Sequence, residues 1–222
     1  MWLGIGDRPA VSVLIVIAKA PVVGRVKTRL CPPCSSRQAA ALAEAALADT
    51  LEAVGAASAD RRVIVLEGEP GDWLPEGFEV LAQRGRGLDE RLAAAFDDAG
   101  GAPSLLIGMD TPQVTARLLE DGLGRLGDPG VDAVLGGASD GGYWAVGLCR
   151  PEPRAFLGVP MSVAGTGEAQ RARLCSLGLR LAELPQLRDI DDVEDACAVA
   201  REAPGSRFAA RLAAILPAVP AA

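Results

Sequence analysis

The first strong structural signal in the sequence is the run from Val11 to Ala18, VSVLIVIA, which is apolar except at Ser12. A run rich in β-branched residues is typical of a central strand that helices cover on both faces, as in mostly parallel sheets. Arg8 is the only basic residue just before it, so a signal-peptide core is the less favoured interpretation. The run therefore predicts a buried strand in an α/β fold.

Strand-like and helix-like segments alternate along the rest of the chain. Helices are expected from about Ser36, with Ser35 or Ser36 as N-cap, then over 88–96, after Pro112, and over 167–177 and 193–202. Further strands are expected at 62–66, 78–82, 104–108, 133–135, 143–148 and 179–184. This alternation predicts a three-layer α/β/α arrangement, with ligands at the carboxyl ends of the strands. We expect a single domain over 1–222, with a frayed tail at 217–222.

Composition excludes several classes of function. With 22 basic and 29 acidic residues the net charge is −7, which argues against a nucleic-acid partner. The five cysteines are odd in number and irregularly spaced, which favours a reducing cytoplasm, and no apolar stretch is long enough for a membrane span. There is no histidine, so histidine bases and zinc sites with histidine ligands are excluded. Carboxylate, metal and phosphate chemistry remains.

A basic segment follows the first expected strand. Residues 19–30, KAPVVGRVKTRL, carry four cations and no acid in an acidic protein, which indicates an anionic partner. Gly24 lets backbone approach a ligand, Lys27 supplies a point charge and Arg29 offers a fork for phosphate. The alternative is a solvated loop whose cations pair with the protein's own acids. Neither a P-loop nor a G-x-G-x-x-G pattern is present.

The pair Cys31 and Cys34 follows this segment directly, in the order C-P-P-C. No second pair and no histidine completes a zinc site, so a rigid turn with two thiols is favoured. Oxidation of the two thiols to each other remains open.

Acidic residues stand at three expected strand ends. Asp110 follows an apolar strand in GMDTP, where a parallel sheet places metal-binding carboxylates, although an N-cap or Asx-turn role is common for such a residue. Asp140 lies in SDGGYW, which a hairpin turn also explains. The segment 188–195, RDIDDVED, holds more acids than helix capping requires. Within it, Asp189 and Asp191 share one side of an extended segment and can both face a cation.

Taken together, these motifs resemble the radical-SAM/selenodomain-associated transferase family, formerly a domain of unknown function. The resemblance runs through nearly the whole chain and is carried by residues 18–30, 83–92, 108–112, 139–144 and 189–195. It implies a glycosyltransferase-A-type fold, a Rossmann-like nucleotide-diphospho-sugar transferase architecture that MobA-like and phospholactate guanylyltransferases share. Fold alone does not choose between these reactions.

The resemblance implies a nucleotide site and a metal site. Its nucleotide-binding half is the first loop, with a metal at Asp110 that Asp189 or Asp191 assists. The ion is Mg²⁺ or Mn²⁺. The expected catalytic residues are Asp110, Lys27 and Asp140, the last as a base for the acceptor hydroxyl. The expected substrate-binding residues are Lys19, Gly24, Arg25, Lys27, Thr28, Arg29, Gln83, Gly87, Arg91, Gly141, Gly142, Tyr143 and Trp144.

The leading hypothesis is glycosyl transfer from a nucleoside-diphosphate sugar to a small acceptor. A guanylyltransferase-like nucleotidyl transfer with release of pyrophosphate uses the same residues, and a non-catalytic nucleotide-binding module is a third possibility. The sequence departs from the family pattern at Asp192 and Val193, where Thr-Pro is usual, and at Met161, where an aromatic residue is common. The sequence does not determine the donor base, the acceptor or the oligomeric state, and a homodimer is one of the open alternatives.

Overall fold

A seven-stranded sheet forms the centre of the computed structural model, which describes residues 11–216. The expected frayed tail at 217–222 lies outside the described residues. The strand order is β3-β2-β1-β4-β6-β5-β7, and β6 runs antiparallel to both of its neighbours while the other pairs are parallel. The strands are β1 (Val13–Lys19), β2 (Arg61–Glu67), β3 (Glu79–Ala82), β4 (Ser104–Gly108), β5 (Ala133–Ala138), β6 (Tyr143–Leu148) and β7 (Leu181–Leu187).

Within residues 11–216, four of the six α-helices and two short 3-10 turns lie between the strands, and the last two helices follow β7. The helices are α1 (Ser36–Ala56), α2 (Leu88–Asp98), α3 (Ala116–Leu126), α4 (Thr166–Ser176), α5 (Val193–Glu202) and α6 (Arg207–Ile215), and the turns are η1 (Thr28–Leu30) and η2 (Pro153–Ala155). Ser35 caps α1 in a capping box with Gln38, so its N-terminal N–H groups are partly satisfied within the chain. The helix expected directly after Pro112 begins only at Ala116, because the Thr115 side chain provides its N-cap.

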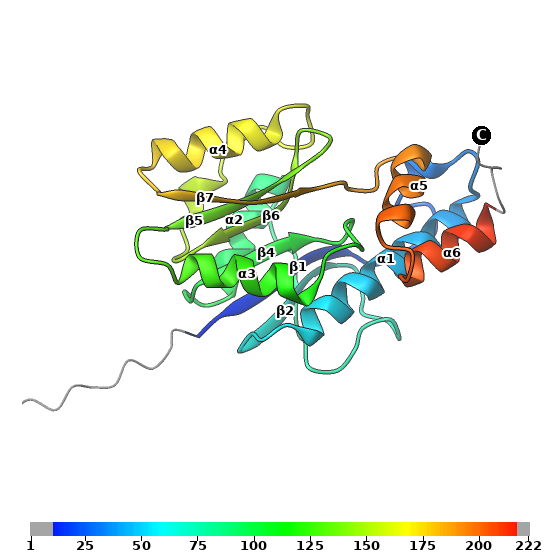
Figure 1. The fold of residues 1–222 in the computed structure, drawn as a ribbon, viewed down its shortest axis with the longest axis horizontal. Helices are drawn as coiled ribbons and strands as arrows, with labels where there is room; N and C mark the ends of the chain where they lie inside the picture. Colours follow the sequence, from blue (N-terminus) through cyan, green and yellow to red (C-terminus); the bar gives the residue numbers. More distant parts are fainter. Residues whose placement is uncertain (1–10, 217–222) are drawn as a thin grey trace, which may run out of the picture.

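Helices cover both faces of the sheet, which explains the continuous apolar run of β1. Leu14 and Val16 face α1 and α3, whereas Val13 and Ile15 face α2 and α4. All four residues are fully buried. Figure 1 shows α1 and α3 on one side of the strands and α4 on the other. The expected α/β/α layers and mostly parallel sheet are confirmed, because a strand buried on both faces cannot alternate polar with apolar residues.

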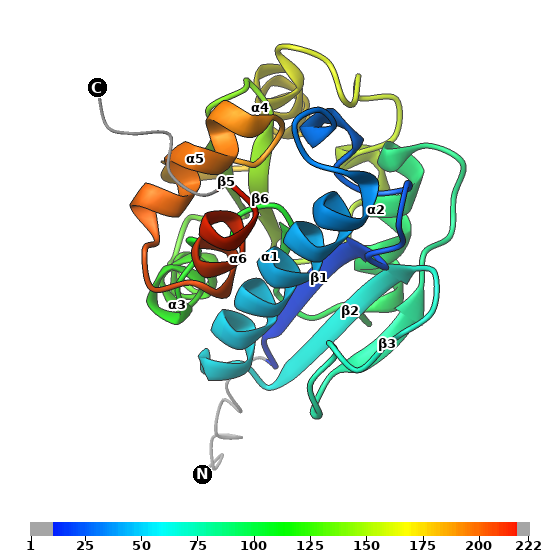
Figure 2. The same cartoon turned by 90° about the vertical axis from the view of Figure 1, so that its right-hand side faces the viewer.

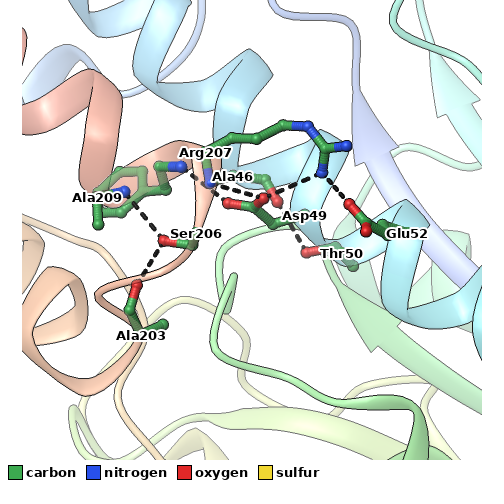
Figure 3. A network of polar contacts seen from close by, with 9 residues as sticks. Ala46, Asp49, Thr50, Glu52, Ala203, Ser206, Arg207 and Ala209 are labelled. Carbon is green, nitrogen blue, oxygen red and sulfur yellow. Dashed lines mark hydrogen bonds and ion pairs between the residues drawn. The ribbon is translucent and has the colours of Figure 1, made fainter.

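A third apolar cluster lies behind α1, where α5 and α6 pack against it. Figure 2 shows α6 alongside α1. Arg207 at the start of α6 pairs with Asp49 and Glu52 of α1, and Ser206 caps α6 (Figure 3). Helix α1 is rich in alanine because it packs on two sides, against the sheet and against α6. The sequence did not predict α6.

Among residues 11–216, none of the helices combines the length and the apolar character that a bilayer crossing requires.

Candidate nucleotide and metal site

The loops of interest meet at one edge of the sheet. Strands β1 and β4 end there, and so do β5 and β7, while the antiparallel β6 begins there. A cavity of about 620 Å³ opens at this edge, and a smaller one of about 260 Å³ adjoins it. Both are lined by Lys19, Arg29, Met109, Asp110 and Asp191. A cavity therefore lies at the edge of the sheet where the strand order predicts ligand binding. The motifs at positions 19–29, 108–112 and 189–191 meet at this edge.

Lys27 is the most buried cation of the first loop. Its side chain is only 9% exposed, and its Nζ lies 2.7 Å from Oδ1 of Asp110. The same ammonium donates a hydrogen bond to the carbonyl of Ile190. The backbone of Lys27 is left-handed (φ 48°), a conformation that only a minority of residues other than glycine adopt. The buried side chains of Val26 and Leu30 flank it and anchor the loop to the core.

The other cations of this loop are more exposed. Arg29 Nη1 lies 2.7 Å from Asp191 Oδ2, and Lys19 Nζ lies 3.6 Å from Glu67 Oε2. Arg25 lines the smaller cavity and makes no ion pair within residues 11–216. The structure thus satisfies both interpretations of this loop: its cations line a cavity, and three of the four pair with the protein's own acids. Gly24 (φ 78°) and the exposed Thr28 complete the loop.

The segment after β4 places Asp110 between the first loop and the segment after β7. The Asp110 carbonyl accepts a hydrogen bond from the N–H of Ile190 at 3.1 Å, while its side chain faces Lys27. Thr111, only 2% exposed, follows it and lines the larger cavity. The Thr111 hydroxyl oxygen has no hydrogen-bond partner among the described residues. Sequence reasoning missed this threonine, although it adjoins the predicted Asp110.

The acidic cluster differs in one member from the expected metal ligands. Carboxylate oxygens of Asp140, Asp189 and Asp191 all lie within 4.8 Å of one another, whereas Asp110 is occupied by Lys27. Ile190 is fully buried between Asp189 and Asp191, which turns both carboxylates toward the cavity as their spacing predicts. Burial and the neighbouring charges of Asp140 and Asp191 raise the pKa of Asp189 to about 6. Three hard oxygen donors this close together form a donor set that suits Mg²⁺ or Mn²⁺.

Asp140 joins the cluster through the turn between β5 and β6. These strands pair antiparallel, so the hairpin interpretation is also right. Asp140 Oδ1 accepts a hydrogen bond from the N–H of Gly142 at 2.7 Å, which fixes its carboxylate. Gly141 has φ 91°, and its carbonyl accepts from Gly167 in the first turn of α4. The turn is therefore held against α4 while its acid faces the cavity.

The two aromatic residues after this turn differ in role. Tyr143 is partly buried, its hydroxyl lies 3.2 Å from Oε1 of Gln170, and burial raises the pKa of its phenol. Trp144 is 97% buried, and its indole N–H donates to the Pro185 carbonyl at 3.0 Å. Both border the larger cavity. Trp144 is mainly a core residue, so Tyr143 and Met161 form the more accessible wall.

Gln83 and Arg91 hold the opposite wall together. The Gln83 amide donates to the carbonyls of Ala18 (2.7 Å) and Val65 (3.1 Å), and its Oε1 accepts from Arg91. Arg91 also pairs with Glu67 at 2.5 Å, and the Arg91 and Lys19 cations lower the pKa of Glu67. Sequence reasoning missed Glu67, although its place at the end of β2 matches that of Lys19 at the end of β1. Gly87, expected near the substrate, is the N-cap of α2 and does not line either cavity.

The thiols of the C-P-P-C segment lie in the third apolar cluster, away from both cavities. Within residues 11–216, which hold all five cysteines, no disulfide forms. Burial raises the pKa of the Cys34 thiol. Both observations agree with a rigid turn that carries two thiols.

The strand order, with its one antiparallel strand, is the fold of nucleotide-diphospho-sugar transferases. Residues 38–163 match the family described as "Uncharacterized protein conserved in bacteria (DUF2064)", and the chain belongs to this family. A search of curated proteins finds no match.

Several solved structures share the fold. A candidate nucleotide-diphospho-sugar transferase from Desulfovibrio desulfuricans G20 is 27% identical, with a TM-score of 0.81 over 90% of this chain and 93% of that one. A Methanothermobacter nucleotidyl transferase is 16% identical, with a TM-score of 0.58 over 86% and 96% of the two chains. CMP:2-keto-3-deoxy-manno-octonic acid synthetase, solved with CTP, is 11% identical, with a TM-score of 0.54 over 88% and 98%. The first two of these proteins are described as sugar or nucleotidyl transferases, which supports a transferase activity.

Proposed function

We propose that the protein is a metal-dependent transferase that moves a sugar from a nucleoside-diphosphate sugar to a small acceptor. The observation that carries this proposal is the meeting of a basic loop and a three-carboxylate cluster around one cavity at the carboxyl edge of the sheet. The Desulfovibrio protein, described as a candidate transferase of this kind, supports the same class of donor. Membership of the finer radical-SAM/selenodomain-associated group is part of the proposal.

Asp140, Asp189 and Asp191 are the residues that would hold Mg²⁺ or Mn²⁺. Their oxygens are close enough to share one ion, and a cation there would relieve the repulsion that raises the pKa of Asp189. The ion would neutralise charge on the phosphates of the leaving nucleotide. Asp110 stands beside this cluster and, with Lys27, faces the phosphate side of the site.

The basic loop would hold the diphosphate. Lys19 and Arg29 border both cavities, Arg25 and Lys27 line the smaller one, and Thr28 adds a hydroxyl. Cations fixed beside the departing phosphate stabilise the charge that develops on it as the sugar bond breaks. The roles of Gln83 and Arg91 are to position: they tie the ends of β1, β2 and α2 together at the wall of the donor site.

The acceptor would lie against Asp140 and Gly142 of the turn and the wall formed by Tyr143 and Met161, while Gly141 does not line the cavity. Asp140 has two candidate roles here, metal ligand and base for the acceptor hydroxyl. The variant Asp140→Asn separates them. A metal ligand predicts weaker Mn²⁺ binding by at least about tenfold, whereas a base predicts unchanged Mn²⁺ affinity and a rate lowered by about 10² to 10⁴.

Nucleotidyl transfer is the second candidate, and the smaller cavity favours it. Four cations line this space of about 260 Å³, beside the acid cluster and apart from most of the larger cavity. Such a space suits a leaving pyrophosphate, which carries more negative charge than the esterified diphosphate of a nucleoside-diphosphate sugar. In this reaction an acceptor phosphate would attack a nucleoside triphosphate and pyrophosphate would leave.

The experiment that tests the proposal is thermal unfolding of the full chain with Mn²⁺ against nucleotide-sugars and nucleoside triphosphates. A ligand at about 100 times its Kd adds about 2.7 kcal/mol to the free energy of unfolding. Stabilisation by one nucleotide-sugar, lost in Asp191→Asn, supports glycosyl transfer, and pyrophosphate release from a triphosphate selects nucleotidyl transfer. Binding without turnover of any acceptor would indicate a non-catalytic module, and no stabilisation by any nucleotide would refute both candidates.

A further inference from the structure

Three ion pairs at the site each join a cation of the basic loop to a carboxylate of the same site. They are Lys19 with Glu67, Lys27 with Asp110, and Arg29 with Asp191. Asp191 belongs to the proposed metal cluster and Asp110 stands beside that cluster, while all three cations stand where phosphates would bind. In this arrangement the cations and carboxylates of the site neutralise one another. A phosphate group or a divalent cation that enters the site therefore finds some of its binding groups already paired.

The Lys27 pair is the most constrained of the three. Its ammonium is nearly buried, touches the Asp110 carboxylate at 2.7 Å and also donates to the Ile190 carbonyl. Ile190 lies between Asp189 and Asp191 in the chain, so the ammonium bridges the segment after β4 and the acid cluster. A divalent ion that approached Asp110 would meet this positive charge first. Asp110 is thus unavailable to a metal while Lys27 holds it.

The Arg29 pair has the same consequence for the acid cluster itself. Asp191 is one of the three clustered carboxylates, and its Oδ2 is engaged by Arg29 at 2.7 Å. The Arg29 side chain is 71% exposed and can move without disturbing the core. A phosphate group would offer both cations stronger acceptors than a single carboxylate, and their departure would free Asp110 and Asp191.

From these contacts we propose an ion-pair exchange at the proposed site: phosphate takes Lys27 and Arg29, and the carboxylates they release take the metal. No covalent bond changes in this exchange. Each ligand therefore binds more tightly once the other is present, and the enhancement must be the same in both directions because binding free energies are reciprocal. The inference rests on the proposed function, because it concerns the same nucleotide and metal.

The ion-pair exchange predicts a result that simple attraction between the charges of the site and its ligands does not predict. Removing Lys27 or Arg29 should free a carboxylate, so Mn²⁺ should bind more tightly in the absence of any nucleotide. Arg25 provides the matched control, because it lies in the same loop and lines the same cavity but pairs with no acid within residues 11–216. Replacing Arg25 removes one positive charge, as the other two variants do, but releases no carboxylate.

The first arm of the experiment titrates Mn²⁺ into the full chain without nucleotide, with bound ion read by electron paramagnetic resonance. Lys27→Met and Arg29→Met should each tighten Mn²⁺ binding by about tenfold relative to Arg25→Met, within the usual range of coupling between sites. Arg29 is exposed, so its variant tests the idea even where Lys27→Met perturbs folding. Equal affinities in Arg25→Met and Arg29→Met would overturn the exchange.

The second arm titrates inorganic pyrophosphate in the presence of a chelator, so that no metal takes part. Asp110→Asn and Asp191→Asn should tighten pyrophosphate binding by about tenfold relative to Asp140→Asn, which removes an acid that pairs with no cation within residues 11–216. Equal tightening in all three variants would overturn the exchange and leave the proposed function standing. Failure of the wild-type chain to bind either Mn²⁺ or pyrophosphate would overturn both.

Discussion

Replacing Asp189 with Asn should make the protein more stable at neutral pH while it weakens metal binding. The pKa of Asp189 rises from its ordinary value of 3.8 to about 6, because the carboxyl is partly buried beside Asp140 and Asp191. An acid whose pKa is higher in the folded state is harder to ionise there than in the unfolded chain. Its contribution to stability is therefore fully present below about pH 4, is lost as the pH rises to about 6, and stays lost above that.

The size of the effect follows from the two pKa values. Their difference of about 2.2 corresponds to about 3 kcal/mol at 1.36 kcal/mol per pKa unit. Because the carboxyl is only partly buried, solvent screens much of this, and we expect a gain of about 1 kcal/mol for Asp189→Asn at pH 7.5. For a chain of this length such a gain raises the melting temperature by about 2 to 4 °C.

The assay is denaturant unfolding of both proteins between pH 4 and pH 8 without metal. The wild-type chain should lose stability relative to Asp189→Asn across this range, most steeply below pH 6. Asp121→Asn, a change at an exposed residue of α3, serves as the control and should follow the wild type. If Asp189→Asn is no more stable than the wild type at pH 7.5, the clustered repulsion inferred here is wrong. Added Mn²⁺ should stabilise the wild type and not Asp189→Asn, which reverses their order.

Two further changes test packing near the site. Gly136→Ala would place a Cβ 2.5 Å from the Trp144 indole nitrogen, so thermal unfolding should show a loss of about 1 to 3 kcal/mol. Gly137→Ala meets nothing within 4 Å and should change stability by less than about 0.5 kcal/mol; equal losses would contradict the close packing of Trp144. Thr111→Val should be neutral or stabilising by up to about 1 kcal/mol, because the buried hydroxyl has no hydrogen-bond partner within residues 11–216. A clear loss of stability of Thr111→Val in denaturant unfolding would mean that the hydroxyl makes a hydrogen bond.

Much of the fold could be predicted because the polar and apolar pattern of a strand reflects which of its faces are buried. The part of the first run that forms β1, from Val13 to Ala18, is apolar because α1 and α2 cover its two faces, and β4 and β6 were placed at their observed bounds. Helix α6 escaped prediction because its apolar face is short and its stability comes from packing against α1 and α5. The start of α3 was misplaced because Thr115, rather than Pro112, provides the cap.

The sequence by itself determined which chemistry is available to this protein. The lack of histidine, the basic loop after the first strand and acids at three strand ends all follow from the order of residues. Only the tertiary structure decided which of these groups meet. Asp140 rather than Asp110 completes the carboxylate cluster, because the β5–β6 turn folds back to the same edge while Lys27 occupies Asp110. Residues far apart in the chain, such as Asp140 and Asp189, are brought together by strand order and register, and no local pattern encodes the distance between their side chains.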